Sequence, residues 1–233
     1  MPKPIFEILK AQKDLLLFRS IAPNLRDHRW HYVAYVSCVS LLAGMGRYWD
    51  HPSAEVWQYL GLGSLAYVIA LSALLYWLLM PLRPANWTYL GVFLFIGLTS
   101  LPALLYAIPV ERFFSLETAQ SANVWFLLVV AAWRVALYIK FLLGAARFDW
   151  LSTFVATLLP LSIIVASLAA LNLEHVVFDL MSGIRPEDRS PNDRAYSIVF
   201  MLTLFAYLAF PVTALCYLIA VYRAFKAKYR VFK

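Results

Sequence analysis

Six long apolar stretches, separated by short polar connections, dominate the pattern of hydrophobic and polar positions along the chain. Each has roughly 18 residues or more with almost no charge, which is too long for a core strand and suits a bilayer about 30 Å thick. The expected spans are Trp30–Tyr48, Val56–Met80, Trp87–Ile108, Asn123–Ala145, Trp150–Leu173 and Ala195–Tyr222. The pattern therefore predicts an all-α fold, a polytopic bundle of six transmembrane helices that occupies residues 30–222.

The residues before the first span follow a different pattern. Between Ile5 and Phe18, apolar positions are interleaved with charged ones such as Lys10 and Lys13, so this segment is too polar to cross a membrane and too apolar to be fully solvated. Helices of this kind lie in the headgroup region, with their basic residues toward anionic lipids. Residues 1–29 are therefore expected to form an amphipathic segment on the cytoplasmic face.

Composition supports the membrane assignment. Of the 233 residues, 63% are hydrophobic and 14% are charged, whereas a soluble domain is about 45–50% apolar and about 25% charged. Seven of the eight Trp residues lie near the ends of the expected spans, at the level that indole rings prefer, and only Trp133 lies in the middle of one.

The distribution of charge predicts the orientation. Fourteen of the twenty Lys and Arg residues fall on the side that holds both chain ends, and nine of the thirteen acids fall on the other side. Because cytoplasmic loops are rich in Lys and Arg, both termini are expected in the cytoplasm of a bacterial inner-membrane protein, with a basic tail at 223–233. The cations expected to contact the membrane surface or an anionic ligand are Lys10, Lys13, Arg19, Arg26, Arg29, Arg223, Lys226 and Lys228.

Sequence motifs for catalysis or metal binding are absent. The chain has no HExxH, CxxC, GxSxG or Walker-type glycine loop. Its four His residues are divided between the two expected sides of the membrane, and the cysteines Cys38 and Cys216 fall inside expected spans. The chain is expected not to be an enzyme and to hold neither a metal nor a cofactor.

One charged residue lies deep in an expected span. Arg134 is about eleven residues from either end of the fourth span, and no Asp or Glu lies deep in another span. A charge at this depth costs on the order of 3 kcal/mol on the insertion scale, so its side chain is expected to face the bundle interior, water or an unpaired carbonyl. Together with Lys140 and Arg147, it is a candidate for a path in which cations outnumber acids, which favours anions.

Three spans contain an internal proline. Pro102, Pro160 and Pro211 each remove one backbone donor and free a carbonyl, which must find another partner. They are candidate hinges, and packing kinks are the alternative. The freed carbonyls are also candidate partners for Arg134, which would then be structural, and the sequence leaves both interpretations open.

The central third of the chain contains a series of short motifs. Residues 88–109 include a Tyr, a Ser-x-Pro and a later apolar-Pro pair, Trp125 and Arg134 follow, and Leu159 and Pro160 come after a short loop. This series, over residues 88–165, resembles that of the bacterial Yip1-type multi-span membrane proteins. The resemblance implies a multi-span fold with a scaffolding or trafficking role, and it supplies no catalytic residues.

These observations lead to two main functional hypotheses. The first is a homo-oligomeric, anion-preferring channel or pore, which would contact the lipid bilayer, associate with itself and bind an anionic cytoplasmic ligand such as a nucleotide or short oligonucleotide. One use of such a channel is as the ligand-gated effector of a bacterial defence system. The second is a non-catalytic Yip1-like scaffold or assembly partner. A secondary transporter ranks third, because paired acids inside the spans are missing.

Overall fold

The described part of the chain forms helices joined by short connections. The computed structural model describes residues 4–19, 25–49, 54–171 and 194–231, and these contain no strand. The α-helices are α1 (Pro4–Leu16), α2 (Leu25–Tyr48), α3 (Val56–Tyr59), α4 (Leu62–Leu79), α5 (Tyr89–Leu98), α6 (Leu116–Gly144), α7 (Trp150–Ala170) and α9 (Arg194–Val231), and the 3-10 helices are η1 (Met80–Leu82), η2 (Leu101–Ala107) and η3 (Val110–Arg112). The predicted all-α class is confirmed.

Five helical segments are long and apolar enough to cross a membrane. They are Leu62–Leu82, Tyr89–Ala107, Ser121–Gly144, Trp150–Ala170 and Ile198–Lys226. These correspond to the second to sixth spans expected from the sequence. The first expected span forms the long helix α2, but it is not among the five, because its Tyr, His and Ser residues lower its mean hydropathy.

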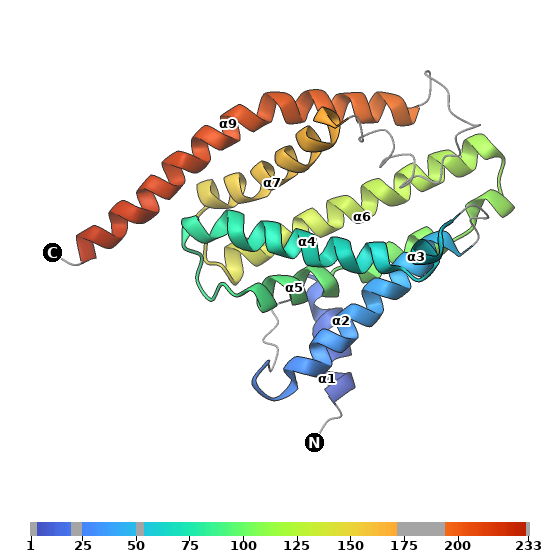
Figure 1. The fold of residues 1–233 in the computed structure, drawn as a ribbon, viewed down its shortest axis with the longest axis horizontal. Helices are drawn as coiled ribbons and strands as arrows, with labels where there is room; N and C mark the ends of the chain where they lie inside the picture. The colour runs from blue at the N-terminus through green and yellow to red at the C-terminus, as the bar shows by residue number, and fades with distance from the viewer. Residues whose placement is uncertain (1–3, 20–24, 50–53, 172–193, 232–233) are drawn as a thin grey trace.

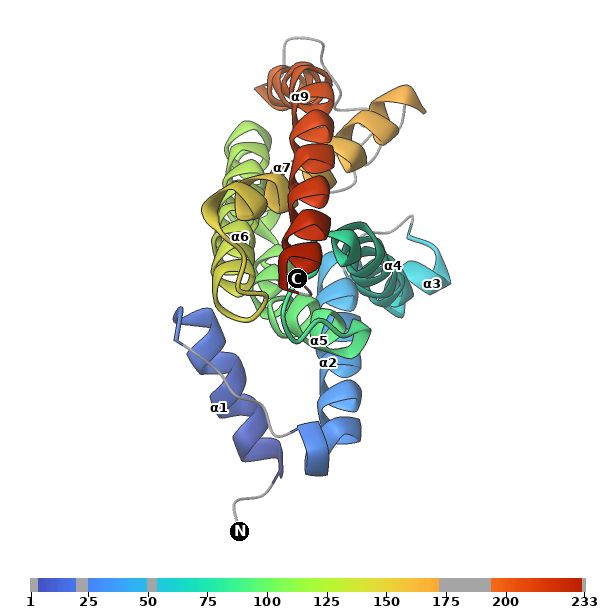
Figure 2. The same cartoon turned by 90° about the vertical axis from the view of Figure 1, so that its left-hand side faces the viewer.

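The helices are arranged around a short central helix. Helices α4, α6, α7 and α9 run roughly alongside one another, and α2 crosses beneath them at an angle (Figure 1). Helices α1 and α9 lie at opposite edges of the molecule in both views (Figures 1 and 2). Helix α5 lies between them, and every side chain from Val92 to Leu98 is buried, so this helix forms the centre of the core.

The predicted span at residues 87–108 is broken rather than kinked. Helix α5 ends at Leu98, and the chain continues through Thr99 and Ser100 into η2. Pro102 has no N–H to donate to the carbonyl of Leu98, four residues before it, so one hydrogen bond of the α-helical ladder is missing at this point. The hydroxyls of Thr99 and Ser100 both donate to the Ile96 carbonyl, at 2.9 and 3.1 Å, and satisfy it at the break.

Side chains on other helices donate hydrogen bonds to backbone carbonyls that the prolines leave without a donor. Gln12 Nε2 on α1 donates to the Leu98 carbonyl at 3.0 Å, four residues before Pro102. The Tyr138 hydroxyl on α6 donates to the Ala156 carbonyl at 3.2 Å, four residues before Pro160. A buried carbonyl without a donor costs free energy, so these two contacts offset the hydrogen bonds that the prolines remove.

Glycines bring α2 into close contact with its neighbours. A Cβ atom added to Gly44 would lie 2.7 Å from both the Gly61 Cα and the Ser64 Oγ, and one added to Gly97 would overlap the Val36 side chain. Small residues permit this kind of close approach between membrane helices. Helix α2 is therefore packed tightly against α4 and α5, although its hydropathy is low.

Candidate functional site

Arg134 lies between α6 and α4, partly exposed. Its guanidinium carbon is 6.0 Å from the centre of the Tyr67 ring. Among the described residues, no carboxylate pairs with Arg134 and no hydrogen bond joins it to a carbonyl. The carbonyls freed by Pro102 and Pro160 accept hydrogen bonds from Gln12 and Tyr138. Arg134 therefore does not stabilise the bundle by binding either of these two carbonyls.

A second arginine lies close by, from a different helix. Arg47, at the end of α2, is half-buried, with its guanidinium carbon 5.8 Å from the Tyr48 ring centre and 5.5 Å from that of Tyr106. Tyr106, in η2, interacts electrostatically with both Arg47 and Arg134. The arginine–tyrosine cluster, formed by Arg47, Tyr67, Tyr106 and Arg134, thus draws on α2, α4, η2 and α6.

Both arginines of this cluster lie beside aromatic rings. A guanidinium group near the face of an aromatic ring is attracted by the ring's quadrupole. Sequence reasoning identified Arg134 as a candidate, whereas it counted Arg47, at the end of the first expected span, only among the charges on the side opposite the termini. The signal that could have found Arg47 is its position next to Tyr48 at a helix end, but its approach to Tyr106 depends on the break after α5.

Lys140 lies in a different environment on the same helix. It lines a pocket of about 550 Å³ between α1, α5, α6 and the connection before α5, together with Arg19 from the end of α1. Arg147 is exposed in the connection between α6 and α7, with a left-handed φ of 55°. The three residues predicted to share one anion path therefore lie in three separate surroundings.

The other predicted residues are placed as follows. Pro102 follows the break in α5, whereas α7 and α9 continue through Pro160, which is buried, and Pro211, which is exposed. The side chains of Lys10, Lys13, Arg19, Arg29, Arg223 and Lys226 are exposed, and those of Arg26 and Lys228 fall outside the described part of the structure. The hinge and surface roles of these residues stay predictions.

Helix α1 is tied to the bundle by polar contacts that sequence reasoning did not find. Besides its bond to Leu98, Gln12 accepts a hydrogen bond from the Tyr35 hydroxyl, and its side chain is 2% exposed. The Trp133 Nε1 donates to the Leu16 carbonyl at 3.1 Å. The unusual mid-span position of Trp133 was the available signal, since a buried indole needs an acceptor.

Comparisons with known proteins do not assign the site. No protein-family model, curated protein or solved structure matches the chain. Within the described residues, no three His, Cys, Asp or Glu side chains come together in a possible metal site.

Proposed function

We propose that the chain is the subunit of a homo-oligomeric membrane channel that prefers anions. The observation that carries this proposal is the hydrogen bond from Trp133 to the Leu16 carbonyl, because it fixes the charged helix α1 beside the middle of a candidate span. Trp133 is twelve residues from Ser121 and eleven from Gly144. At 1.5 Å of rise per residue, α1 then ends roughly 16–18 Å from either end of that span.

A charged helix at this depth needs water. Lys10 and Lys13 are exposed on α1, and Arg19 is exposed just beyond its end. Charged side chains do not face hydrocarbon at the middle of a bilayer but turn to the bundle interior or to water. We infer that a water-filled vestibule enters from the cytoplasmic side and reaches α1, so the segment expected on the cytoplasmic surface lines this vestibule.

The charges around α1 favour anions. Its acids are already engaged, since Asp14 pairs with Arg19 at 3.3 Å and Glu7 lies 3.7 Å from His28. No described residue forms an ion pair with Lys10, Lys13 or Lys140. A path whose cations outnumber its free acids attracts anions, and Arg134, which forms no ion pair with a described residue, offers a second cationic level.

Self-association follows from the position of α1. It lies at one edge of the subunit, opposite α9 (Figure 2), so a single copy cannot enclose the space next to it. Further copies, arranged with their α1 edges inward, would enclose a common vestibule and leave the exposed apolar side chains of α9, such as Phe205 and Leu208, toward lipid.

Helix α2 is proposed to be an additional span beside the five, and it is the first of the six along the chain. The chain kinks at His28, where φ is -121° and ψ is 18°, and the continuous helix that follows, residues 29–48, is about 20 residues long, enough to cross a bilayer. Its polar Ser40 and Tyr32 are buried, whereas the exposed positions along its length after His31 are Ala34, Cys38, Leu42 and Met45. A helix that buries its polar groups against protein and turns an apolar stripe outward can cross a bilayer despite low mean hydropathy. With six spans both termini lie on the same side of the membrane, and the excess of Lys and Arg on that side supports our proposal that it is the cytoplasmic side of a bacterial inner membrane.

An anionic cytoplasmic ligand, a nucleotide or short oligonucleotide, is the proposed gating signal, and a defence effector is one use of such a channel. The Yip1-like scaffold is the alternative. It differs in one physical respect that can be measured, because a scaffold does not need water beside α1.

Cysteine accessibility tests the vestibule directly. In a background with Cys38→Ala and Cys216→Ala, Lys13→Cys should react with a membrane-impermeant anionic thiol reagent applied from the cytoplasmic side. Leu208→Cys, exposed on α9, is the matched control and should be protected by lipid. Equal protection of the two cysteines would show that no water-filled vestibule reaches α1. The scaffold would then be the better hypothesis than the channel.

Conduction is the second measurement. Purified full-length protein in a planar bilayer under a salt gradient should give a reversal potential close to the equilibrium potential of the anion. Lys13→Gln should shift it toward zero, whereas Lys226→Gln, an exposed cation at the far end of α9, should not. A reversal potential on the cation side would contradict the proposed selectivity.

A further inference from the structure

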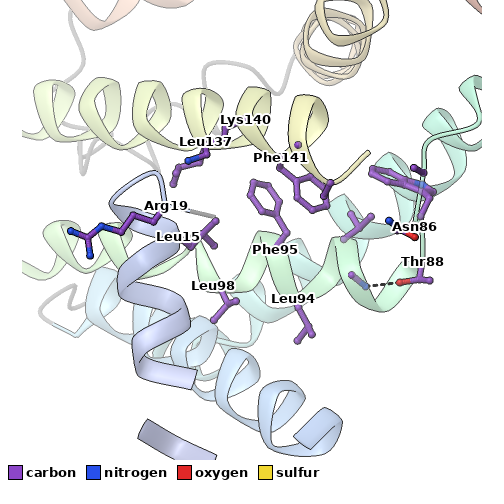
Figure 3. A pocket seen from close by; sticks show the side chains of 16 residues that line it. Leu15, Arg19, Asn86, Thr88, Leu94, Phe95, Leu98, Leu137, Lys140 and Phe141 are labelled. Atoms are coloured by element: carbon purple, nitrogen blue, oxygen red, sulfur yellow. Dashed lines mark hydrogen bonds between the residues drawn. The ribbon is translucent and has the colours of Figure 1, made fainter. Parts of the chain in front are cut away.

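The pocket that contains Lys140 has an amphipathic lining. Its walls are mostly apolar, with Leu15, Leu94, Leu98, Leu137 and other side chains around the stacked rings of Phe95 and Phe141. These two rings lie 4.2 Å apart, at an angle of 11°. The polar groups are few: Arg19 and Lys140 lie on one side of the ring pair, and Asn86 and Thr88 lie on the other (Figure 3).

The charged side chains that line this pocket are both cationic. No acidic residue lines it, and no described residue forms an ion pair with Lys140. Arg19 is paired with Asp14, but 66% of its side chain is exposed, so it retains donors for another anion. A ligand that matches these features carries a negative charge at one end and a long apolar portion elsewhere.

We propose that this pocket binds an anionic phospholipid. Its phosphate lies between Lys140 and Arg19, and an acyl chain covers Phe95 and Phe141. The volume of about 550 Å³ is within the range of ligand sites, roughly 300–1,000 Å³. A nucleotide fits less well, because the walls offer few hydrogen-bond partners for ribose hydroxyls and base edges, and unpaired polar groups in an apolar site lower affinity.

Its place in the fold gives the lipid a structural consequence. The pocket joins α1 to α5 and α6, so an occupied pocket has contacts with all three helices. The connection before α5 closes one side, where the Ala85 N–H donates to the Ala146 carbonyl at 2.9 Å. A lipid held here stabilises the docked position of α1. This inference concerns binding and does not depend on conduction.

A larger side chain at Gly144 should block the pocket without disturbing the fold. It lines the pocket, and a Cβ atom added there meets no atom within 4 Å. Gly144→Leu places a bulky side chain at the pocket, and leucine is a better helix former than glycine. Gly144→Ala is the matched small variant.

The test uses full-length protein in neutral detergent, with dioleoyl phosphatidylglycerol and dioleoyl phosphatidylcholine as probes. Native mass spectrometry and the melting temperature report binding. The anionic lipid should bind at least tenfold more tightly than the zwitterionic one, and Lys140→Gln and Gly144→Leu should each weaken it at least tenfold. Gly144→Ala and Lys13→Gln, an exposed cation that does not line the pocket, should bind as the native chain does.

Three results would overturn the proposal. Equal binding of the two lipids would show that the cations do not select charge. Unchanged binding in both Lys140→Gln and Gly144→Leu, with native melting curves, would place the lipid elsewhere. Equally tight binding of inorganic phosphate or of a cyclic dinucleotide would show that the acyl chain is not recognised. If the anionic lipid does not bind but Lys13→Cys still reacts with the thiol reagent, the lipid proposal is wrong and the channel proposal still holds.

Discussion

Gln12 donates a hydrogen bond to the carbonyl of Leu98, the carbonyl that Pro102 leaves without a backbone donor. The two residues are 86 positions apart, and both are buried. Tyr35 in turn donates to the Gln12 side-chain oxygen, so one amide joins α1, α2 and the end of α5. The break in the central helix and the attachment of α1 are therefore a single structural feature.

Replacing this amide should destabilise the fold. Gln12→Leu leaves the buried Leu98 carbonyl without a donor, at about 1–3 kcal/mol, and it also removes the acceptor of the half-buried Tyr35 hydroxyl. Thermal melting in detergent measures the loss, and Lys10→Leu on the exposed side of α1 is the control. In a Pro102→Ala background, which restores an N–H, Gln12→Leu should cost less. Additive losses would show that Gln12 does not serve the freed carbonyl.

The same logic applies at the second proline. Tyr138→Phe removes the donor to the Ala156 carbonyl and should lower stability by about 1 kcal/mol. Tyr207→Phe, at an exposed tyrosine of α9, should change it by less than about 0.5 kcal/mol. Melting curves of the two variants in one detergent give the comparison, and equal losses would contradict the assigned role.

Two glycine substitutions should act in opposite directions. Gly97→Ala adds a Cβ that overlaps Val36, so it should destabilise the packing of α5 on α2 despite the better helix propensity of alanine. Gly144→Ala meets no neighbour and should stabilise α6 by up to about 1 kcal/mol. Melting temperatures that rise for both would mean that α2 and α5 are less tightly packed than described.

Arg134 separates the structural and functional interpretations of the bundle. Arg134→Gln removes a charge that has no ion pair or hydrogen bond with the described residues. Stability should therefore change little, while the reversal potential should move toward zero. Removing one partner of a buried ion pair typically costs about 3–5 kcal/mol. A loss of this size with an unchanged reversal potential would make Arg134 structural and favour the scaffold.

The start of α7 should respond to pH. Asp149 caps this helix by accepting from the Ser152 N–H at 3.0 Å, and hydrogen bonding from Ser152, chiefly from its side chain, holds the pKa of the carboxyl below its ordinary value. The stabilisation is therefore fully present above the ordinary carboxyl pKa, and it is lost as the pH falls through the lowered one.

Asp149→Ala should cost about 0.5–2 kcal/mol at neutral pH, and Asp149→Asn should retain much of the cap without its acid dependence. Melting temperatures between pH 3 and pH 7 measure the difference between the native chain and Asp149→Asn. Parallel curves for these two proteins would rule out a contribution from the charged cap.

The apolar pattern was sufficient to predict the helices but not their interruptions. Long uncharged runs predict helices wherever they occur, so the five candidate spans and α2 lie close to their expected positions. The sequence marks Pro102 as a possible kink. The proline alone does not decide whether a helix bends or ends, since α5 ends before Pro102 whereas α7 continues through Pro160. The side chain that satisfies the Leu98 carbonyl, Gln12, is 86 residues away, so no local pattern identifies it.

The candidate site divides in the same way. Arg134 was identified because a charge in an apolar run is conspicuous in sequence alone. Arg47 was not, because its role depends on η2 carrying Tyr106 back toward α2. Lys140 was grouped with Arg134 because the two share a helix, but a spacing of six positions directs their side chains toward different neighbours.

The contacts of α1 also set an order of events during synthesis. Gln12 leaves the ribosome 86 residues before Leu98, and Leu16 leaves it 117 residues before Trp133. Until both partners have entered the membrane, α1 has no docking site and must remain outside the growing bundle. The first segment to be translated is therefore among the last to find its place, and every nascent chain passes through a form in which α1 is undocked.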